Sequence, residues 1–195
     1  MQEATEPPLD APGAGLPGPE LFIARQLFAW KRLVGSREGF SRRFEAERRA
    51  IRERVDSLHE ADRGRRILIP RLRGLEDSSR YWSVWMTLDH LRITNQAFAS
   101  VIGSLAAGQM PPGKADTAAV KPSPAADAGS EAAFEASCEQ LVATVAGIAS
   151  LETSLRFPHP WFGPLTAAGW HALSATHLGI HRAQIAAIAE RLARS

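Results

Sequence analysis

Cysteine is nearly absent from this sequence, in which Cys138 is the single cysteine among 195 residues. No disulfide can therefore form within the chain, which is typical of a reducing compartment, and we expect a cytoplasmic protein. No run approaches the roughly 18 consecutive apolar residues of a membrane-spanning helix, so we expect no membrane span. The first 19 residues lack a basic start followed by an apolar stretch. We expect a flexible tail there and no secretory signal.

Alternation of apolar and polar residues, the pattern of a half-buried strand, is also missing. Apolar residues recur instead at helical spacing, and 45% hydrophobic content suits one domain over residues 20–195. We predict an all-α fold, a four-helix bundle. The expected helical regions are about 20–59, interrupted near Gly35 to Gly39; from a cap at Asp77 or Ser78 to about 106; from Ser130 to just before 157; and from a cap at Thr166 onward.

Residues 107–129 are rich in Pro, Ala and Gly and show no periodicity, so we predict a linker between the second and third helices. A helix of about 27 residues is roughly 40 Å long, and a linker of this length can span about 75 Å when extended. The second and third helices can therefore be parallel, with a long crossover between them. This predicts an up-down-down-up bundle, and a loose hairpin connection is the alternative.

Positive charge is concentrated in residues 21–80, which hold 16 Lys and Arg against 9 Asp and Glu. A basic segment raises the question of nucleic acid. Glu is interleaved with Arg at helical spacing here, which favours a salt-bridged helix surface. No motif that reads DNA accompanies the charge. The pattern argues against a nucleic-acid partner.

Three histidines fall on the apolar faces of two predicted helices. His177 and His181 are four residues apart, so they lie one turn above the other on the last helix. His90 lies on the apolar stripe of the second helix, between Met86 and Ile93. Burying imidazoles costs free energy unless each finds a partner, and one shared metal ion satisfies all three. The alternative is that each is a hydrogen-bonded core residue.

Three protein ligands leave coordination positions open, which is typical of a catalytic metal site. Neutral nitrogen ligands suit zinc or nickel, with iron as a further candidate. Gln184, three residues after His181, could orient a ligand or a bound water, or form a hydrogen bond inside the bundle. No Asp or Glu shares the two histidine stripes, so no general base is evident.

The remaining histidines and the cysteine have simpler interpretations. His59 closes the first helical region, where a cation favours the helix dipole. His159 lies in the turn FPHPWFGP, and His171 is rotated off the histidine stripe, so we expect surface or packing roles for both. Cys138 falls among apolar positions and is expected in the core.

The segments GLEDSSRYWSVWMTLDHL with His90, HPWFGPLTAAGW, and THLGIHRAQI with His177 and His181 together resemble the DinB/YfiT-like metalloenzyme family. The HPxFGxLT turn before the H-x3-H helix resembles an uncharacterised bacterial subgroup. The resemblance implies an up-down-down-up bundle in which the three histidines bind a divalent metal at one end. It also implies that homodimers are common.

Characterised members of that family include transferases and isomerases that use a low-molecular-weight thiol, so the resemblance implies a thiol as a candidate second cofactor. From the whole sequence we predict a metal-dependent enzyme acting on a small-molecule substrate, either a thiol-dependent transferase or a hydrolase. The alternative is a non-catalytic helical bundle that binds a metal or another ligand.

Overall fold

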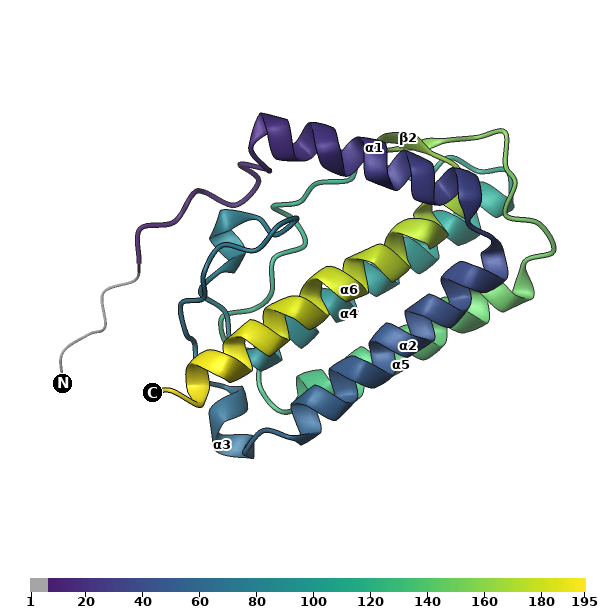
Figure 1. The fold of residues 1–195 in the computed structure, drawn as a ribbon. Coiled ribbons are helices and arrows are strands. Elements are labelled where there is room, and N and C mark those ends of the chain that lie inside the picture. Colours follow the sequence, from purple (N-terminus) through teal and green to yellow (C-terminus); the bar gives the residue numbers. More distant parts are fainter. Residues whose placement is uncertain (1–6) are drawn as a thin grey trace.

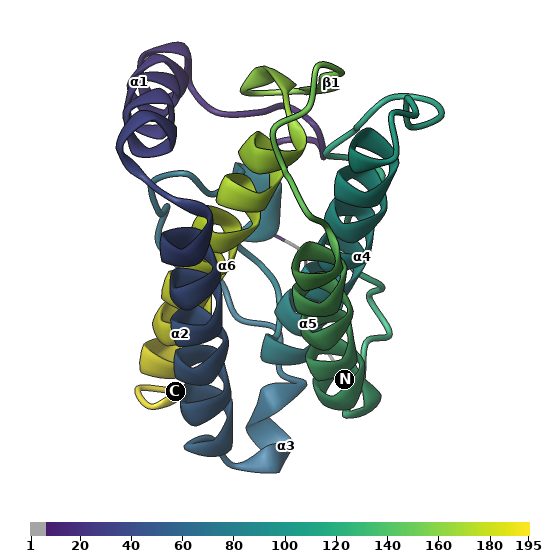
Figure 2. The same cartoon turned by 90° about the vertical axis from the view of Figure 1, so that its right-hand side faces the viewer.

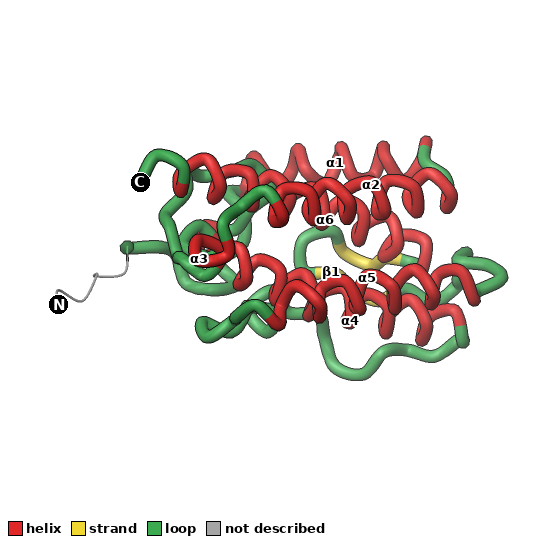
Figure 3. The backbone as a smooth tube through the Cα atoms, turned by 90° about the horizontal axis from the view of Figure 1, so that it is seen from below, coloured by secondary structure: helices red, strands yellow, loops and turns green. Residues whose placement is uncertain are grey.

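A computed structural model describes residues 7–195 of the chain, which are helical apart from loops and one short hairpin (Figures 1 and 3). The helices are α1 (Gly18–Val34), α2 (Arg37–Asp56), α3 (Glu60–Arg63), α4 (Val84–Ala106), α5 (Gly129–Gly147) and α6 (Ala167–Leu192). The predicted all-α four-helix bundle is confirmed, and it consists of α2, α4, α5 and α6. Among residues 7–195, no helix has both the length and the apolar character needed to cross a bilayer.

Polar side chains start three of the bundle helices. The hydroxyl of Ser36 accepts a hydrogen bond from the third amide of α2, Ser83 does so for α4, and Thr166 for α6. The first helical region therefore breaks at Gly35 and Ser36, inside the predicted interruption, and Thr166 is the expected cap. The predicted cap of the second helix at Asp77 or Ser78 is wrong. Those residues form a short 3-10 turn (Asp77–Ser79).

Helix directions follow from the side-chain contacts between neighbours. α4 and α5 are parallel, since Trp85 Nε1 donates to Glu131 at 2.8 Å near their starts and Asn95 donates to Ser137 at 3.2 Å near their middles. α2 and α6 are likewise parallel to each other, through Ser41 with His171 and Glu47 with Arg182. The two pairs run in opposite directions, and residues 107–128 cross back along α4 to reach α5 (Figure 2).

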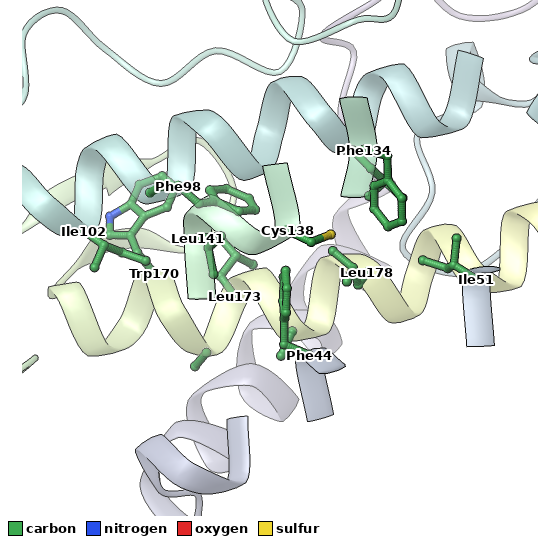
Figure 4. Packing of buried hydrophobic residues seen from close by; sticks show 14 of the residues in the cluster. Phe44, Ile51, Phe98, Ile102, Phe134, Cys138, Leu141, Trp170, Leu173 and Leu178 are labelled. Carbon is green, nitrogen blue, oxygen red and sulfur yellow. The ribbon is translucent and has the colours of Figure 1, made fainter. Parts of the chain in front are cut away.

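The core lies where the four bundle helices meet (Figure 4). Phe44 and Ile51 of α2, and Leu178 of α6, are buried to 1% exposure or less. Cys138 is buried among them, as expected, and it accepts a hydrogen bond from the side-chain amide of Asn95 at 3.3 Å. The bundle therefore has a continuous apolar interior, and its polar groups need partners inside it.

The chain between α5 and α6 differs from the expected turn. α5 ends at Gly147, ten residues before FPHPWFGP, where the third helix was predicted to end. That segment is an antiparallel hairpin of β1 (Phe157–His159) and β2 (Gly163–Leu165). The indole of Trp170 donates to the carbonyl of Phe157 at 3.2 Å, which holds the hairpin against the start of α6. Its prolines and short strands gave no alternating pattern.

Segments expected to be loose make specific contacts. Residues 1–6 of the predicted tail 1–19 lie outside the described residues, and α1 begins at Gly18. The amides of Gly13 and Gly15 donate to the carboxylate of Glu76 at 3.3 and 3.1 Å. In the linker, the amide of Ser123 donates to Asp89 at 2.9 Å. The N-terminal segment thus packs against the chain that precedes α4, and the linker packs beside the first turns of α4.

Candidate metal centre

The three predicted histidines lie together. His90 comes from α4, His177 and His181 come from α6, and one ligand atom of each lies within 4.8 Å of the others. The Nε2 of His177 is 3.2 Å from the Nε2 of His90 and 3.2 Å from the Nε2 of His181. Nitrogens bound to one ion at 2.0 to 2.1 Å in tetrahedral geometry are about 3.3 Å apart. The spacing therefore fits three ligands of a common ion.

Hydrogen bonds fix the protonation of two of these rings. Nδ1 of His90 lies 2.6 Å from the carbonyl oxygen of Val120, which can only accept, so this nitrogen carries the proton. The amide nitrogen of Gln184 donates to the carbonyl of Ser79 at 2.7 Å, so its oxygen faces Nδ1 of His181 at 2.6 Å. That nitrogen is also protonated. In the neutral rings, both Nε2 atoms consequently present bare lone pairs.

The bare lone pairs point to a cation. His177 can donate from Nε2 to at most one of its two neighbours, so the other close contact sets two lone pairs against each other. Nδ1 of His177 is buried and has no partner within residues 7–195. A divalent ion accepts all three lone pairs and removes the conflict. The donor set therefore fits a metal, and no carboxylate among the described residues joins the cluster.

Aromatic rings pack against two of the histidines. The indole of Trp82 stacks on His181 with a centroid separation of 6.3 Å and an interplanar angle of 8°. Phe98 meets His177 edge to face at 5.5 Å. Burial lowers the pKa of His90 to about 4 and lowers the pKa of His177 and His181 well below the usual value. All three rings are therefore neutral at pH 7.

A cavity of about 940 Å³ opens beside the three histidines. Its walls come from α1, α4, α6, the linker and the hairpin, and they carry mostly apolar side chains. His159 of β1 lines the same cavity, although the sequence suggested only a surface or packing role. His171 is buried and contacts Ser41 at 3.2 Å, and His59 accepts from an amide at the start of α3, so neither joins the cluster.

A family model of the DinB superfamily matches residues 43–185, which include all three histidines. The chain belongs to the DinB superfamily. Outside the matched range of this DinB-superfamily chain lies all of α1, which forms one wall of the cavity.

One solved structure resembles the DinB-superfamily chain in fold. It is the crystal structure of TT2238, described as a four-helix bundle protein, with a TM-score of 0.56 and 19% sequence identity. The likeness covers 82% of this chain and 100% of that one. No curated protein matches the chain in sequence. At this identity the likeness supports the bundle fold alone.

A divalent metal bound to the three histidines should be released by acid at a lower pH than one bound to unperturbed imidazoles. Protons and metal compete for the same Nε2 atoms, and an unperturbed imidazole protonates near roughly pH 6.5. Burial lowers the pKa of His90 to about 4, so occupancy should persist below pH 6.5 and fall toward about pH 4. The unfolded chain protonates first, so stability of the apo-protein should also fall over this interval. Dialysis against fixed zinc across pH, with metal analysis, measures it; half-loss already at pH 6.5 would contradict the expectation.

Proposed function

We propose that the chain is a metal-dependent enzyme that acts on a small molecule bound in the 940 Å³ cavity. The observation that carries the proposal is the convergence of three Nε2 atoms, two of them bare by hydrogen bonding, on the wall of that cavity. His90, His177 and His181 would hold zinc or nickel, with iron as a further candidate. A divalent ion with three protein ligands and an open position lowers the pKa of a water to about 7 and ionises a bound thiol.

The chain's own residues divide the remaining tasks. The carbonyl of Val120 and the side chain of Gln184 hold two imidazoles in the tautomer and orientation that ligation needs. His177, whose Nδ1 has no partner in residues 7–195, is the least constrained ligand. Trp82 packs against the ring of His181 and Phe98 against that of His177, which helps to hold both rings in place. A reaction at the open position then takes place in the cavity.

The two chemistries that suit this arrangement are thiol transfer, with a low-molecular-weight thiol as second cofactor, and hydrolysis by an activated water. The superfamily assignment and the neutral three-nitrogen donor set support both. A catalytic role requires an open coordination position and an apo-protein that stays folded. A bundle that binds a metal only to stabilise its fold needs no open coordination position, and it can unfold when the metal is removed.

Cobalt substitution separates these cases. Protein stripped with a chelator is expected to keep its helical circular dichroism, because the core beneath the site is apolar, and to rebind about one Co²⁺ per chain. Adding a small thiol should then produce a sulfur-to-cobalt charge-transfer band, as thiolate enters the open position. A visible spectrum that neither thiol nor azide changes, with loss of fold on stripping, would indicate a closed structural site.

A further inference from the structure

His159 presents a single fixed hydrogen-bond donor at the cavity. Its Nδ1 accepts from the amide of Trp161 at 3.1 Å and lies 3.4 Å from that of Phe162, so the proton of the neutral ring is on Nε2. Burial lowers the pKa of His159 to about 4, which keeps the ring neutral. Within residues 7–195, no group accepts from Nε2, and this atom is not enclosed by protein. Because His159 lines the cavity, this fixed donor is available to hydrogen-bond a ligand bound there.

Aromatic rings surround this donor. The centroids of Phe162, Trp170 and Trp161 lie 5.2, 5.4 and 6.3 Å from the centroid of His159, and all three residues line the cavity. Rings at such distances form flat apolar walls that suit a flat apolar ligand. The body of the ligand is therefore expected to be apolar and planar.

The charges of the cavity lining favour an anion. Two lining pairs cancel, since Arg71 binds Glu20 at 2.5 Å and Lys121 binds Glu76. The lining residues left without an ion-pair partner among the described residues are Lys31, Arg73, Lys114 and Asp116. Three positive charges thus face one negative charge, and a divalent ion would add to the excess.

We propose that the cavity binds an organic anion with a flat apolar body, and that the Nε2–H of His159 donates the hydrogen bond that orients it beside the three histidines. The inference rests on the proposed function, because it names the substrate class of the same cavity. His159 is then a substrate-binding residue. A neutral donor fixes orientation, while the distributed positive charge supplies the preference for an anion.

A matched pair of dyes tests the ligand class. Anilinonaphthalene sulfonate is an anion whose apolar body consists of two flat aromatic groups, and phenylnaphthylamine has the same rings without the sulfonate. Fluorescence titration should show about one sulfonate dye per chain, bound at least about tenfold more tightly than the neutral dye. Arg73→Ala should weaken the sulfonate dye severalfold and leave the neutral dye unchanged. Arg49→Ala, an exposed arginine away from the cavity, is the control.

A matched set of substitutions tests His159. His159→Asn keeps an acceptor for the amide of Trp161 but removes the Nε2 donor, and it should weaken the sulfonate dye about tenfold at an unchanged melting temperature. His159→Gln places an amide N–H near the former Nε2 and should restore binding in part. His59→Asn is the control, because Nδ1 of His59 also accepts an amide, at 3.3 Å, outside the cavity.

Ala97→Trp locates the dye. Ala97 is an exposed residue of α4 on the cavity lining, so a tryptophan there should fill the cavity and abolish binding without unfolding the bundle. Dye that stays bound would lie on another surface, such as the exposed apolar residues of α1, and would overturn the inference. Equal affinity for both dyes, or unchanged binding in both His159 variants, would also overturn it.

Zinc binding, measured on the same samples by dialysis, separates this inference from the proposed function. One zinc per chain without any preference for the anionic dye would leave the metal centre standing and remove the substrate class. A clear preference for the anionic dye in a chain that binds no zinc would remove the metal centre and keep the ligand class. The chain would then be an anion-binding bundle.

Discussion

Replacing His90, His177 or His181 by alanine is expected to reduce metal affinity by more than the 10- to 100-fold that loss of a residue supporting a ligand costs. Each substitution removes one of three converging Nε2 atoms, and no carboxylate among the described residues can take its place. The helical signal should stay close to that of the native chain, because the apolar core lies beneath the cluster. Metal content of protein purified without a histidine tag measures the effect.

His59→Ala is the control for these variants, since His59 has a ring nitrogen bonded to an amide but lies away from the cluster. It should retain full metal content. Full metal content in all three cluster variants would mean that the ion binds elsewhere, and the three rings would then be hydrogen-bonded core residues.

Gln184→Leu is expected to weaken metal binding less than the three histidine substitutions do. Leucine keeps the volume of the side chain but frees Nδ1 of His181 and leaves the carbonyl of Ser79 without its donor. Metal affinity should fall 10- to 100-fold, less than on loss of a ligand. An affinity equal to that of the native chain would show that His181 needs no support from Gln184.

Glu76→Ala is expected to lower the free energy of unfolding by about 3 kcal/mol, the lower end of the range for breaking a buried ion pair, because Lys121 keeps some contact with water. Glu76 is 4% exposed and accepts from Lys121 and from the amides of Gly13 and Gly15. Loss of the carboxylate leaves these amide and ammonium donors without an acceptor. Urea unfolding at pH 7 measures the change, and metal affinity should weaken as residue 121 is released.

At acid pH, the difference in unfolding free energy between the native chain and Glu76→Ala should become smaller. Burial by itself raises the pKa of the Glu76 carboxyl, but the hydrogen bonds from Lys121, Gly13 and Gly15 outweigh burial and lower the pKa. The ionised carboxylate therefore contributes its full stability above the unfolded pKa, near 4.5, and loses it as pH falls through the lower folded value. Asp62→Ala is the control: Asp62 pairs with Arg65 at the surface, and its loss should cost less than about 1 kcal/mol. If Glu76→Ala lowered the free energy of unfolding by no more than Asp62→Ala, the prediction for Glu76 would be wrong.

Periodicity was enough to predict the bundle and to place His90, His177 and His181 each on the inward face of a long helix. That the three meet at one site was implied by the family resemblance, and the structure brings them together. The spacing of His177 and His181 on one helix is a local property that the sequence carries directly. The interruption of the first helix near Gly35 was also predictable, because it depends on glycines that are close together in the sequence.

The sequence pattern of the irregular segments was too weak to predict their structure. The caps at Ser83 and Ser36 compete with other serines and aspartates nearby, and only tertiary packing decides among them. The hairpin at Phe157–Leu165 is too short for alternation to register. The donor role of His159 depends on amides two and three residues later folding back onto its ring, which no spacing rule encodes. The available hint was a histidine among the three aromatic residues of FPHPWFGP.

The partner of His90 is a main-chain carbonyl, that of Val120, and this determines what evolution can alter. Any residue at position 120 supplies the same oxygen, so comparison of related sequences would not reveal this contact. What must be kept is the path of the chain, which Lys121 fixes through Ser78 at 2.9 Å and the amide of Ser123 fixes through Asp89. Relatives should therefore tolerate insertions and deletions between 107 and 116, and keep a constant length from 117 to 123.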